Sequence, residues 1–165
     1  MGIAQTLFKC LHLVVRCLQA ASAMTVLGLS AYVATWYNRD TLTASPSQVN
    51  FLVFVPCWSI ISLLYLEVTP KFAPRIANPY ASIFFEATNF LFYVAGAGAL
   101  GHFLARLLFC RGMVCTVAHA DAGIAGALAV MWFYTMGTLI MDVFKIGFRK
   151  NAATMTRPKP EMSAA

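Results

Sequence analysis

The feature that most constrains this chain is a set of four apolar runs, each long enough to cross a lipid bilayer. About 20 apolar residues in a helix suffice to cross the hydrocarbon core, and only short polar connectors separate the runs. The sequence predicts membrane-spanning helices over about residues 8–36, 46–68, 79–109 and 117–148. Together they predict one all-α integral membrane domain over residues 1–148, folded as a four-helix bundle.

The composition excludes an ordinary soluble domain. Of the 165 residues, 60% are hydrophobic and 11% are charged, against roughly 25% charged in a typical soluble domain. The first run does not resemble a cleavable signal, because Lys9 and Arg16 interrupt it and it continues to Tyr37 without a clear cleavage site. We interpret it as a retained first helix.

The basic residues predict an antiparallel, up-and-down topology with both termini in the cytosol. The formal net charge is +6, and most of the basic residues fall on one side of the membrane if the chain crosses four times, which is the usual cytosolic excess. This distribution also argues against a nucleic-acid partner. We expect the polar residues 149–165 to form a disordered basic cytosolic tail. The residues on the predicted cytosolic side are Lys9, Arg16, Lys71, Arg75, Lys145, Arg149, Lys150, Arg157 and Lys159.

One carboxylate, Glu86, lies inside the third apolar run. An ion at that depth costs about 3 kcal/mol or more unless it is paired or hydrated. Arg16 and Glu86 both lie about two turns into their helices from the cytosolic side. We therefore predict an ion pair between them, flanked by Gln19 and Asn89. A proton or ion relay is the alternative, but the middle of the bundle offers only Tyr93 and a few hydroxyls.

A second set of polar residues lies near the predicted outer side of the membrane, and we expect these side chains to form a second polar cluster. Cys110 and Cys115 alone do not make a metal site, which needs more ligands, but His102 and His119 lie nearby and leave a zinc site as an alternative. The sequence also lacks HExxH, Gly-x-Ser-x-Gly and P-loop motifs. We predict neither an enzyme nor a cofactor, although lipids or a sterol could bind. The residues of this second set are His102, Arg106, His119 and Asp121, while Asp142 and Lys145 are expected to cap the last helix.

Glycines predict close helix packing in the outer half of the bundle. Gly96, Gly98 and Gly101 match GxGxxG, but the match lies in mid-helix rather than between a strand and a helix, so a dinucleotide site is not indicated. Gly123 and Gly126 lie in an alanine-rich part of the fourth run. Small residues allow helix backbones to approach closely. We expect the two patches to meet as an antiparallel pair.

Two cysteines, Cys110 and Cys115, bracket the short outer loop between the last two helices. Oxidising conditions outside the cytosol permit a disulfide there, which fits a short loop better than a metal site does. Cys10, Cys17 and Cys57 lie in or beside helices. Small apolar packing is expected of them, with palmitoylation of Cys10 as an alternative.

Several segments along most of the chain together resemble the fungal MARVEL-domain, or membrane-associating, proteins. The acidic position before Asn89 is often Asp in that family, so Glu86 would be a conservative variant. The resemblance covers about residues 5–148. The segments that carry it are Arg16-x-x-Gln19, Val49-Asn50-Phe51 with Phe54 and Trp58, Pro79-Tyr80-Ala81, Glu86-Ala87-Thr88-Asn89-Phe90 followed by Phe92-Tyr93 and Ala95-Gly96, and the pair Cys110 and Cys115.

The resemblance implies a non-enzymatic scaffold that organises membrane microdomains. Such a protein would associate laterally with itself, with lipids such as sterols and sphingolipids, or with other membrane proteins. The plasma membrane is its expected location, with an endomembrane as the alternative. Two other hypotheses stay open: a small transporter or channel that uses Glu86, and an accessory subunit of a larger membrane complex.

Overall fold

The structure is a computed structural model, and it describes residues 2–40, 44–72, 78–106 and 112–155. Each of these ranges contains one long helix, and none of them contains a strand. The prediction of an all-α protein with four long apolar helices is therefore confirmed. The helices are α1 (Gly2–Asp40), α2 (Ser47–Phe72), α3 (Pro79–Arg106) and α4 (Met113–Met155).

Every helix contains a segment that is long and apolar enough to cross a membrane. These segments are Cys10–Arg39, Ser47–Phe72, Pro79–Arg106 and Met113–Lys145. Large apolar side chains also point away from the bundle, which is tolerated in a bilayer because lipid tails are as apolar as leucine. Examples are Phe54, Leu64, Phe84, Leu91, Phe133 and Phe144.

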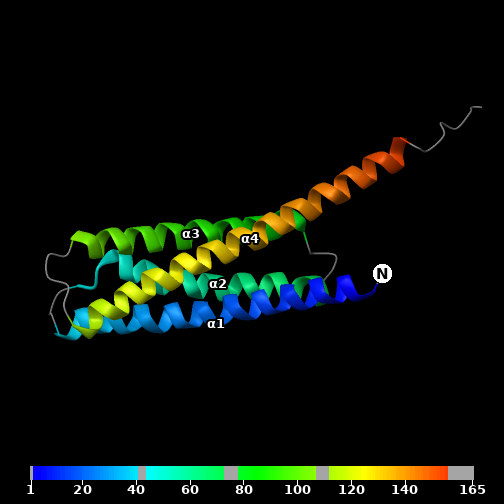
Figure 1. Ribbon diagram of the computed structural model, residues 1–165. Helices are drawn as coiled ribbons and strands as arrows, with labels where there is room; N and C mark the ends of the chain where they lie inside the picture. The colour runs from blue at the N-terminus through cyan, green and yellow to red at the C-terminus, as the bar shows by residue number, and fades with distance from the viewer. Residues whose placement is uncertain (1, 41–43, 73–77, 107–111, 156–165) are drawn as a thin grey trace, which may run out of the picture.

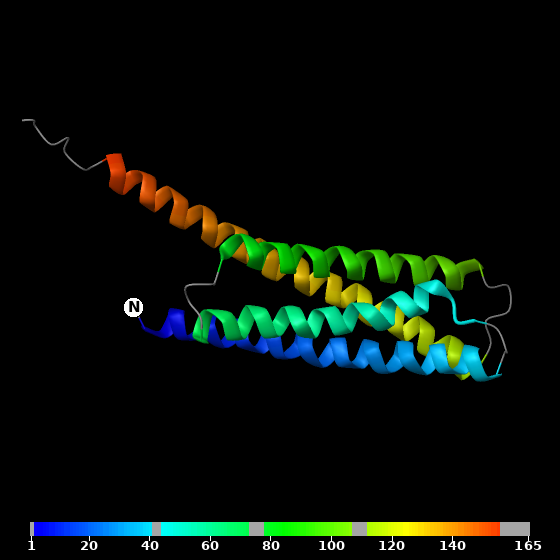
Figure 2. The same cartoon turned by 180° about the vertical axis from the view of Figure 1, so that it is seen from behind.

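The four helices form a ring in which each helix packs against its two neighbours. α1 packs against α2 and α4, and α3 packs against the same two helices, most extensively against α4. Successive helices run in opposite directions, so α1 begins and α4 ends on the same side of the bundle (Figures 1 and 2). α1 and α3 therefore occupy opposite corners of the ring. The cytosolic location of this end stays a prediction.

Local sequence explains where two of the helices begin. Asn78 precedes α3, and its side-chain oxygen accepts a hydrogen bond from the backbone N–H of Tyr80 at 3.0 Å, while Pro79 takes the first helical position, where no N–H is needed. Gly112 precedes α4 with a φ of 100°. This left-handed conformation favours glycine, because other residues meet a steric penalty there.

The last helix differs from the prediction. α4 continues to Met155, so the expected disorder of residues 149–165 is wrong for residues 149–155, and residues 156–165 lie outside the described ranges. A polar sequence does not stop a helix by itself, and the first proline after Met113 is Pro158. At 1.5 Å per residue the 43 residues of α4 extend about 64 Å. The helix must therefore project beyond a hydrocarbon core of about 30 Å, and its last part lies clear of the other helices (Figures 1 and 2).

The other helix bounds differ by smaller amounts. α1 begins at Gly2, about two turns before the predicted start, and α2 continues to Phe72 rather than ending at residue 68. The described part of α3 ends at Arg106. Residues 107–109, which were predicted to complete α3, lie outside the described ranges.

Candidate intramembrane polar site

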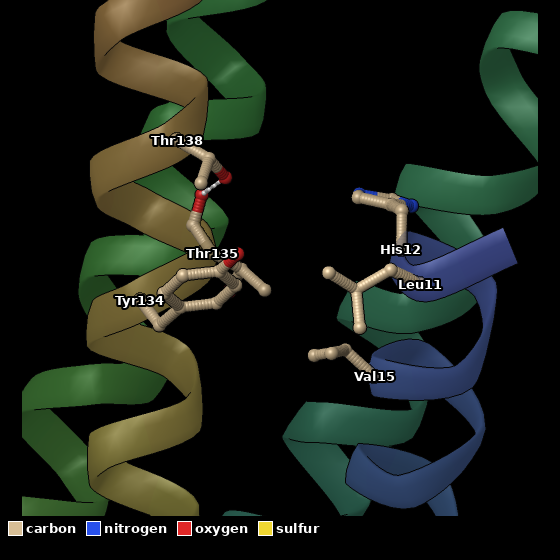
Figure 3. A pocket seen from close by; sticks show the side chains of 6 residues that line it. All are labelled: Leu11, His12, Val15, Tyr134, Thr135 and Thr138. Atoms are coloured by element: carbon tan, nitrogen blue, oxygen red, sulfur yellow. Dashed lines mark hydrogen bonds between the residues drawn. The ribbon is translucent and has the colours of Figure 1, made fainter. Parts of the chain in front are cut away.

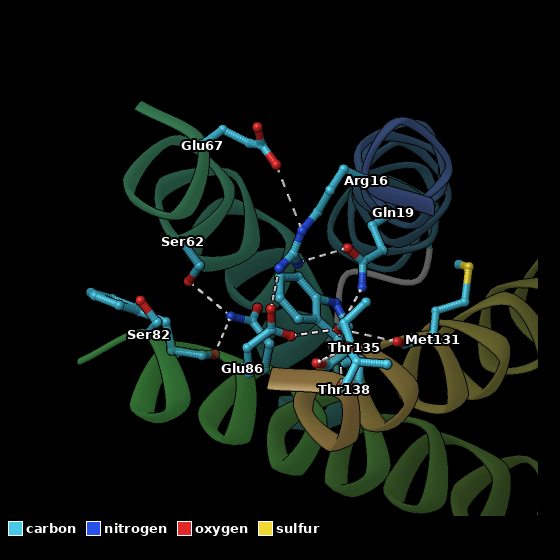
Figure 4. Close-up of polar contacts among 12 residues, drawn as sticks. Arg16, Gln19, Ser62, Glu67, Ser82, Glu86, Met131, Thr135 and Thr138 are labelled. Carbon is cyan, nitrogen blue, oxygen red and sulfur yellow. Dashed lines mark hydrogen bonds and ion pairs between the residues drawn. The ribbon is translucent and has the colours of Figure 1, made fainter. Parts of the chain in front are cut away.

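Arg16 of α1 pairs with Glu86 of α3 in the interior of the bundle (Figure 4). The Arg16 Nη2 donates a hydrogen bond to the Glu86 Oε1. Arg16 is 8% exposed and Glu86 is 0% exposed. Because α1 and α3 occupy opposite corners, this ion pair crosses the centre of the bundle.

The Arg16 side chain contacts all four helices. Its Nη1 donates to the Oε1 of Gln19 in α1 at 3.0 Å, and its Nε lies 3.8 Å from the Glu67 Oε1 in α2. Its Cζ lies 5.7 Å from the ring centroid of Trp132 in α4, a cation–π distance. Together with the contact to Glu86, one guanidinium group links the four membrane helices.

The second oxygen of Glu86 also has a hydrogen-bond partner. Thr135 of α4 donates its Oγ1–H to the Glu86 Oε2 at 2.6 Å. The Gln19 Nε2 donates to the same Thr135 oxygen at 3.3 Å. A buried carboxylate with a charged and a neutral donor has much of its desolvation penalty offset. Sequence reasoning missed Thr135, because a single threonine in an apolar helix gives no sign of its partner.

Asn89 belongs to a separate network between α2 and α3. Its Nδ2 donates to the Ser62 Oγ at 2.8 Å and to the Phe85 carbonyl at 2.8 Å. Its Oδ1 accepts from the Ser59 Oγ at 2.7 Å, and the Ser59 and Tyr93 hydroxyl oxygens lie 3.0 Å apart. The four residues predicted as one cluster thus divide into an Arg16–Gln19–Glu86 network and an Asn89 network.

The predicted outer cluster is wrong in its membership. Asp121 is 1% exposed and its Oδ2 accepts a hydrogen bond from the Ser30 Oγ of α1 at 2.5 Å. His102, Arg106 and His119 are exposed instead. The reason is helical geometry, because Asp121 lies on the face of α4 that packs against the bundle. Among the described residues no group of His, Cys, Asp or Glu side chains could hold a metal ion.

The Asp142–Lys145 pair lies on the exposed surface of α4. The Lys145 Nζ lies 3.9 Å from the Asp142 Oδ1, and both side chains are exposed. An exposed pair of this kind contributes about 0–1 kcal/mol. The expected cap is wrong, because α4 continues to Met155 and the pair lies within the helix rather than at its end.

Only one of the five predicted packing glycines has this role within the described residues. A Cβ atom on Gly96 would lie 2.7 Å from the Leu52 Cδ2, so the absence of a side chain lets α3 approach α2, not α4 as expected. Beyond the adjacent residues and backbone of its own helix, a Cβ atom on Gly98, Gly101, Gly123 or Gly126 would meet no described atom within 4 Å. The close glycine contact predicted between α3 and α4 is therefore wrong, although these two helices pack more extensively than any other pair. The buried small residues of α4 are alanines, namely Ala118, Ala125 and Ala129.

The cysteines add little to the site. Cys10, Cys17 and Cys57 are exposed free thiols, so the small apolar packing expected of them is absent. Cys115 lies in the first turn of α4, and Cys110 falls outside the described residues. The disulfide between them stays a prediction.

The described residues thus form four spanning helices linked by an intramembrane ion pair, and this architecture agrees with a known protein family. A family model named MARVEL and described as "Membrane-associating domain" matches residues 9–144. The chain belongs to the MARVEL family. The match covers the spanning part of all four helices and the residues of the polar site, and it confirms the resemblance seen in the sequence. Searches of curated proteins and of solved structures find no match. This MARVEL protein is therefore an integral, multi-pass membrane protein.

A small cavity adjoins the polar site between α1 and α4 (Figure 3). Its volume is about 10 Å³, close to the smallest space that holds one water molecule. Thr135, which donates to Glu86, forms part of its wall. The cavity therefore has no room for a solute at this point. The lining residues are Leu11, His12, Val15, Tyr134, Thr135 and Thr138.

Proposed function

We propose that this MARVEL protein is a non-enzymatic scaffold that organises membrane microdomains by lateral association with itself, with lipids and with other membrane proteins. Family membership supports the membrane-associating part of the proposal. The observation that carries lateral association is the open surface at Gly98, Gly101, Gly123 and Gly126, where a Cβ would meet no described atom of another helix within 4 Å. Small residues on a membrane helix allow a second helix to pack closely.

A shallow groove on the surface of the α3/α4 pair that faces away from the bundle supports the same proposal. It has a volume of about 470 Å³, and Gly126 is one of its lining residues. Its walls are apolar, so packing against a neighbouring helix needs no desolvation of polar groups. We assign this face to a second copy of the chain. The lining residues are Phe90, Val94, Gly126, Ala129, Val130 and Phe133.

The polar site supports a rigid building block rather than a transport path. Glu86 is fully buried and both of its oxygens have hydrogen-bond partners. Buried ion pairs can specify one arrangement of packed helices over others. We therefore assign Arg16 and Glu86 to holding the four helices in register, and we place the scaffold in the plasma membrane with its termini in the cytosol.

Native mass spectrometry of the protein in native-lipid nanodiscs tests this proposal. The expected result is a set of masses at multiples of the protomer, with the oligomer fraction reduced by Gly126→Leu. Gly28→Leu is the matched control, because Gly28 lies on α1 and a Cβ atom there would likewise meet no atom of another helix within 4 Å. A lone protomer for the unmodified chain would overturn self-association. A mass that includes a different protein would favour the accessory-subunit hypothesis.

A further inference from the structure

A second groove lies between α1 and α2, on the side of the bundle away from the α3/α4 face. It has a volume of about 470 Å³, within the range of small-molecule sites. From Leu13 to Met24, α1 rises about 16 Å, roughly half of a 30 Å hydrocarbon core. The groove is therefore about as long as one leaflet is thick. Its apolar walls are formed by Leu13, Ala20, Met24, Ile60, Leu63 and Leu64.

One end of this groove carries charged groups. It is the end near the N-terminus of α1 and the C-terminus of α2, where Arg16, Glu67 and Lys71 line the wall. The Lys71 Nζ lies 3.2 Å from the Glu67 Oε2, and these side chains are 66% and 30% exposed. The groove therefore has apolar walls along most of its length and a partly exposed pair of opposite charges at one end.

Arg16 supplies a second, independent feature at the same end. Its Nε is buried and has no hydrogen-bond acceptor among the described residues, the Glu67 Oε1 being 3.8 Å away. A buried donor without an acceptor is unfavourable. Because Arg16 lines the groove, a movement of its side chain would let an oxygen atom in the groove satisfy this donor.

We propose that this groove binds one chain of a phospholipid whose headgroup carries a primary amine, such as phosphatidylethanolamine, from the leaflet that contains the charged end. The acyl chain lies between α1 and α2, and an ester oxygen accepts from the Arg16 Nε. The phosphate faces Lys71, and the ammonium group donates to Glu67. The inference names a lipid partner for the proposed scaffold and rests on that function only for its place in a membrane.

The charges distinguish this headgroup from other common ones. A phosphate and an ammonium group complement Lys71 and Glu67 respectively, whereas a purely anionic headgroup offers the Glu67 carboxylate no donor beyond those of Lys71 and Arg16. A choline headgroup is also zwitterionic, but it has no N–H to donate to the Glu67 carboxylate. Hydrogen bonds to ionised groups are stronger than neutral ones. The site should therefore prefer the primary amine to choline.

The test uses the full chain in nanodiscs made from equal parts of phosphatidylethanolamine and phosphatidylcholine with identical acyl chains. Native mass spectrometry counts the lipids that stay bound. The unmodified protein should retain the amine lipid about tenfold over the choline lipid, as expected for one charge-assisted hydrogen bond. Equal retention of the two lipids would overturn the proposal.

Two variants separate the apolar and charged parts of the site. Ala20→Phe fills the groove and should abolish retention, whereas Ala21→Phe places the same ring on an exposed position outside it. Glu67→Gln should keep the lipid but remove the preference for the amine. Unchanged lipid binding in Ala20→Phe, or an unchanged preference in Glu67→Gln, would contradict the assignment. The same spectra give the number of protomers, so loss of lipid selectivity is distinguished from loss of self-association.

Discussion

Arg16 and Glu86 pair across the bundle from two helices that do not pack against each other. The contact is possible because both side chains are long. Each of the four helices also places a side chain that contacts Arg16 or Glu86 at the same depth in the bundle. Gln19 and Thr135 complete the hydrogen bonds of the pair from α1 and α4. The geometry of the ion pair therefore depends on the arrangement of all four helices rather than on a single helix interface.

Removing one member of this pair should destabilise the protein more than replacing both. Glu86→Ala leaves a buried guanidinium without its main counter-ion and should lower the free energy of unfolding by about 3–5 kcal/mol. The double variant Arg16→Met with Glu86→Leu replaces both charges with apolar groups and should lose much less. Unfolding in mixed detergent measures both. Equal losses in the two variants would contradict a structural role for the pair.

Gly96 should tolerate a methyl group less well than Gly98. Gly96→Ala places its Cβ 2.7 Å from the Leu52 Cδ2, and Leu52 is fully buried. Overpacking of this kind costs about 1–3 kcal/mol. In Gly98→Ala the new methyl group meets open space. Both variants gain the same helix propensity, so the difference between their free energies of unfolding isolates the contact with α2. Identical melting temperatures would show that Leu52 adapts freely.

Ser30 should stabilise the bundle through Asp121. Ser30→Ala removes the hydroxyl that donates to the buried carboxylate at 2.5 Å, and an unsatisfied buried group costs about 1–3 kcal/mol. Ser47→Ala, at an exposed position in the first turn of α2, serves as the control. The two variants are compared by thermal unfolding. If both behave alike, the Ser30–Asp121 contact contributes nothing to stability.

Vesicles that contain the protein should stay impermeable to protons and small ions. Glu86 is held by Arg16 and Thr135, and the adjoining cavity of about 10 Å³ has room for one water molecule at most. A pH-sensitive dye inside the vesicles reports any leak. Proton flux that disappears in Glu86→Gln, with the fold retained, would instead support the transporter hypothesis.

Much of the polar site follows from depth along the helices. The predicted helix starts place Arg16 and Glu86 each about two turns from the same membrane surface, and a buried charge requires a partner, so their pairing can be predicted without a structure. Asn89 was placed in the same cluster for the same reason, yet its hydrogen bonds lead to Ser59 and Ser62 on α2. Depth alone does not say to which neighbouring helix a side chain points.

The sequence by itself determined the number of spanning helices, their class and the family, because each apolar run must satisfy its own backbone hydrogen bonds within the bilayer. The tertiary structure decided which face of each helix turns inward. Asp121 turns toward Ser30, Gly96 contacts α2, and Gly126 stays open. The physical reason is that lipid tails and a protein core are equally apolar, so hydrophobicity along a membrane helix does not distinguish its buried face from its lipid-facing one.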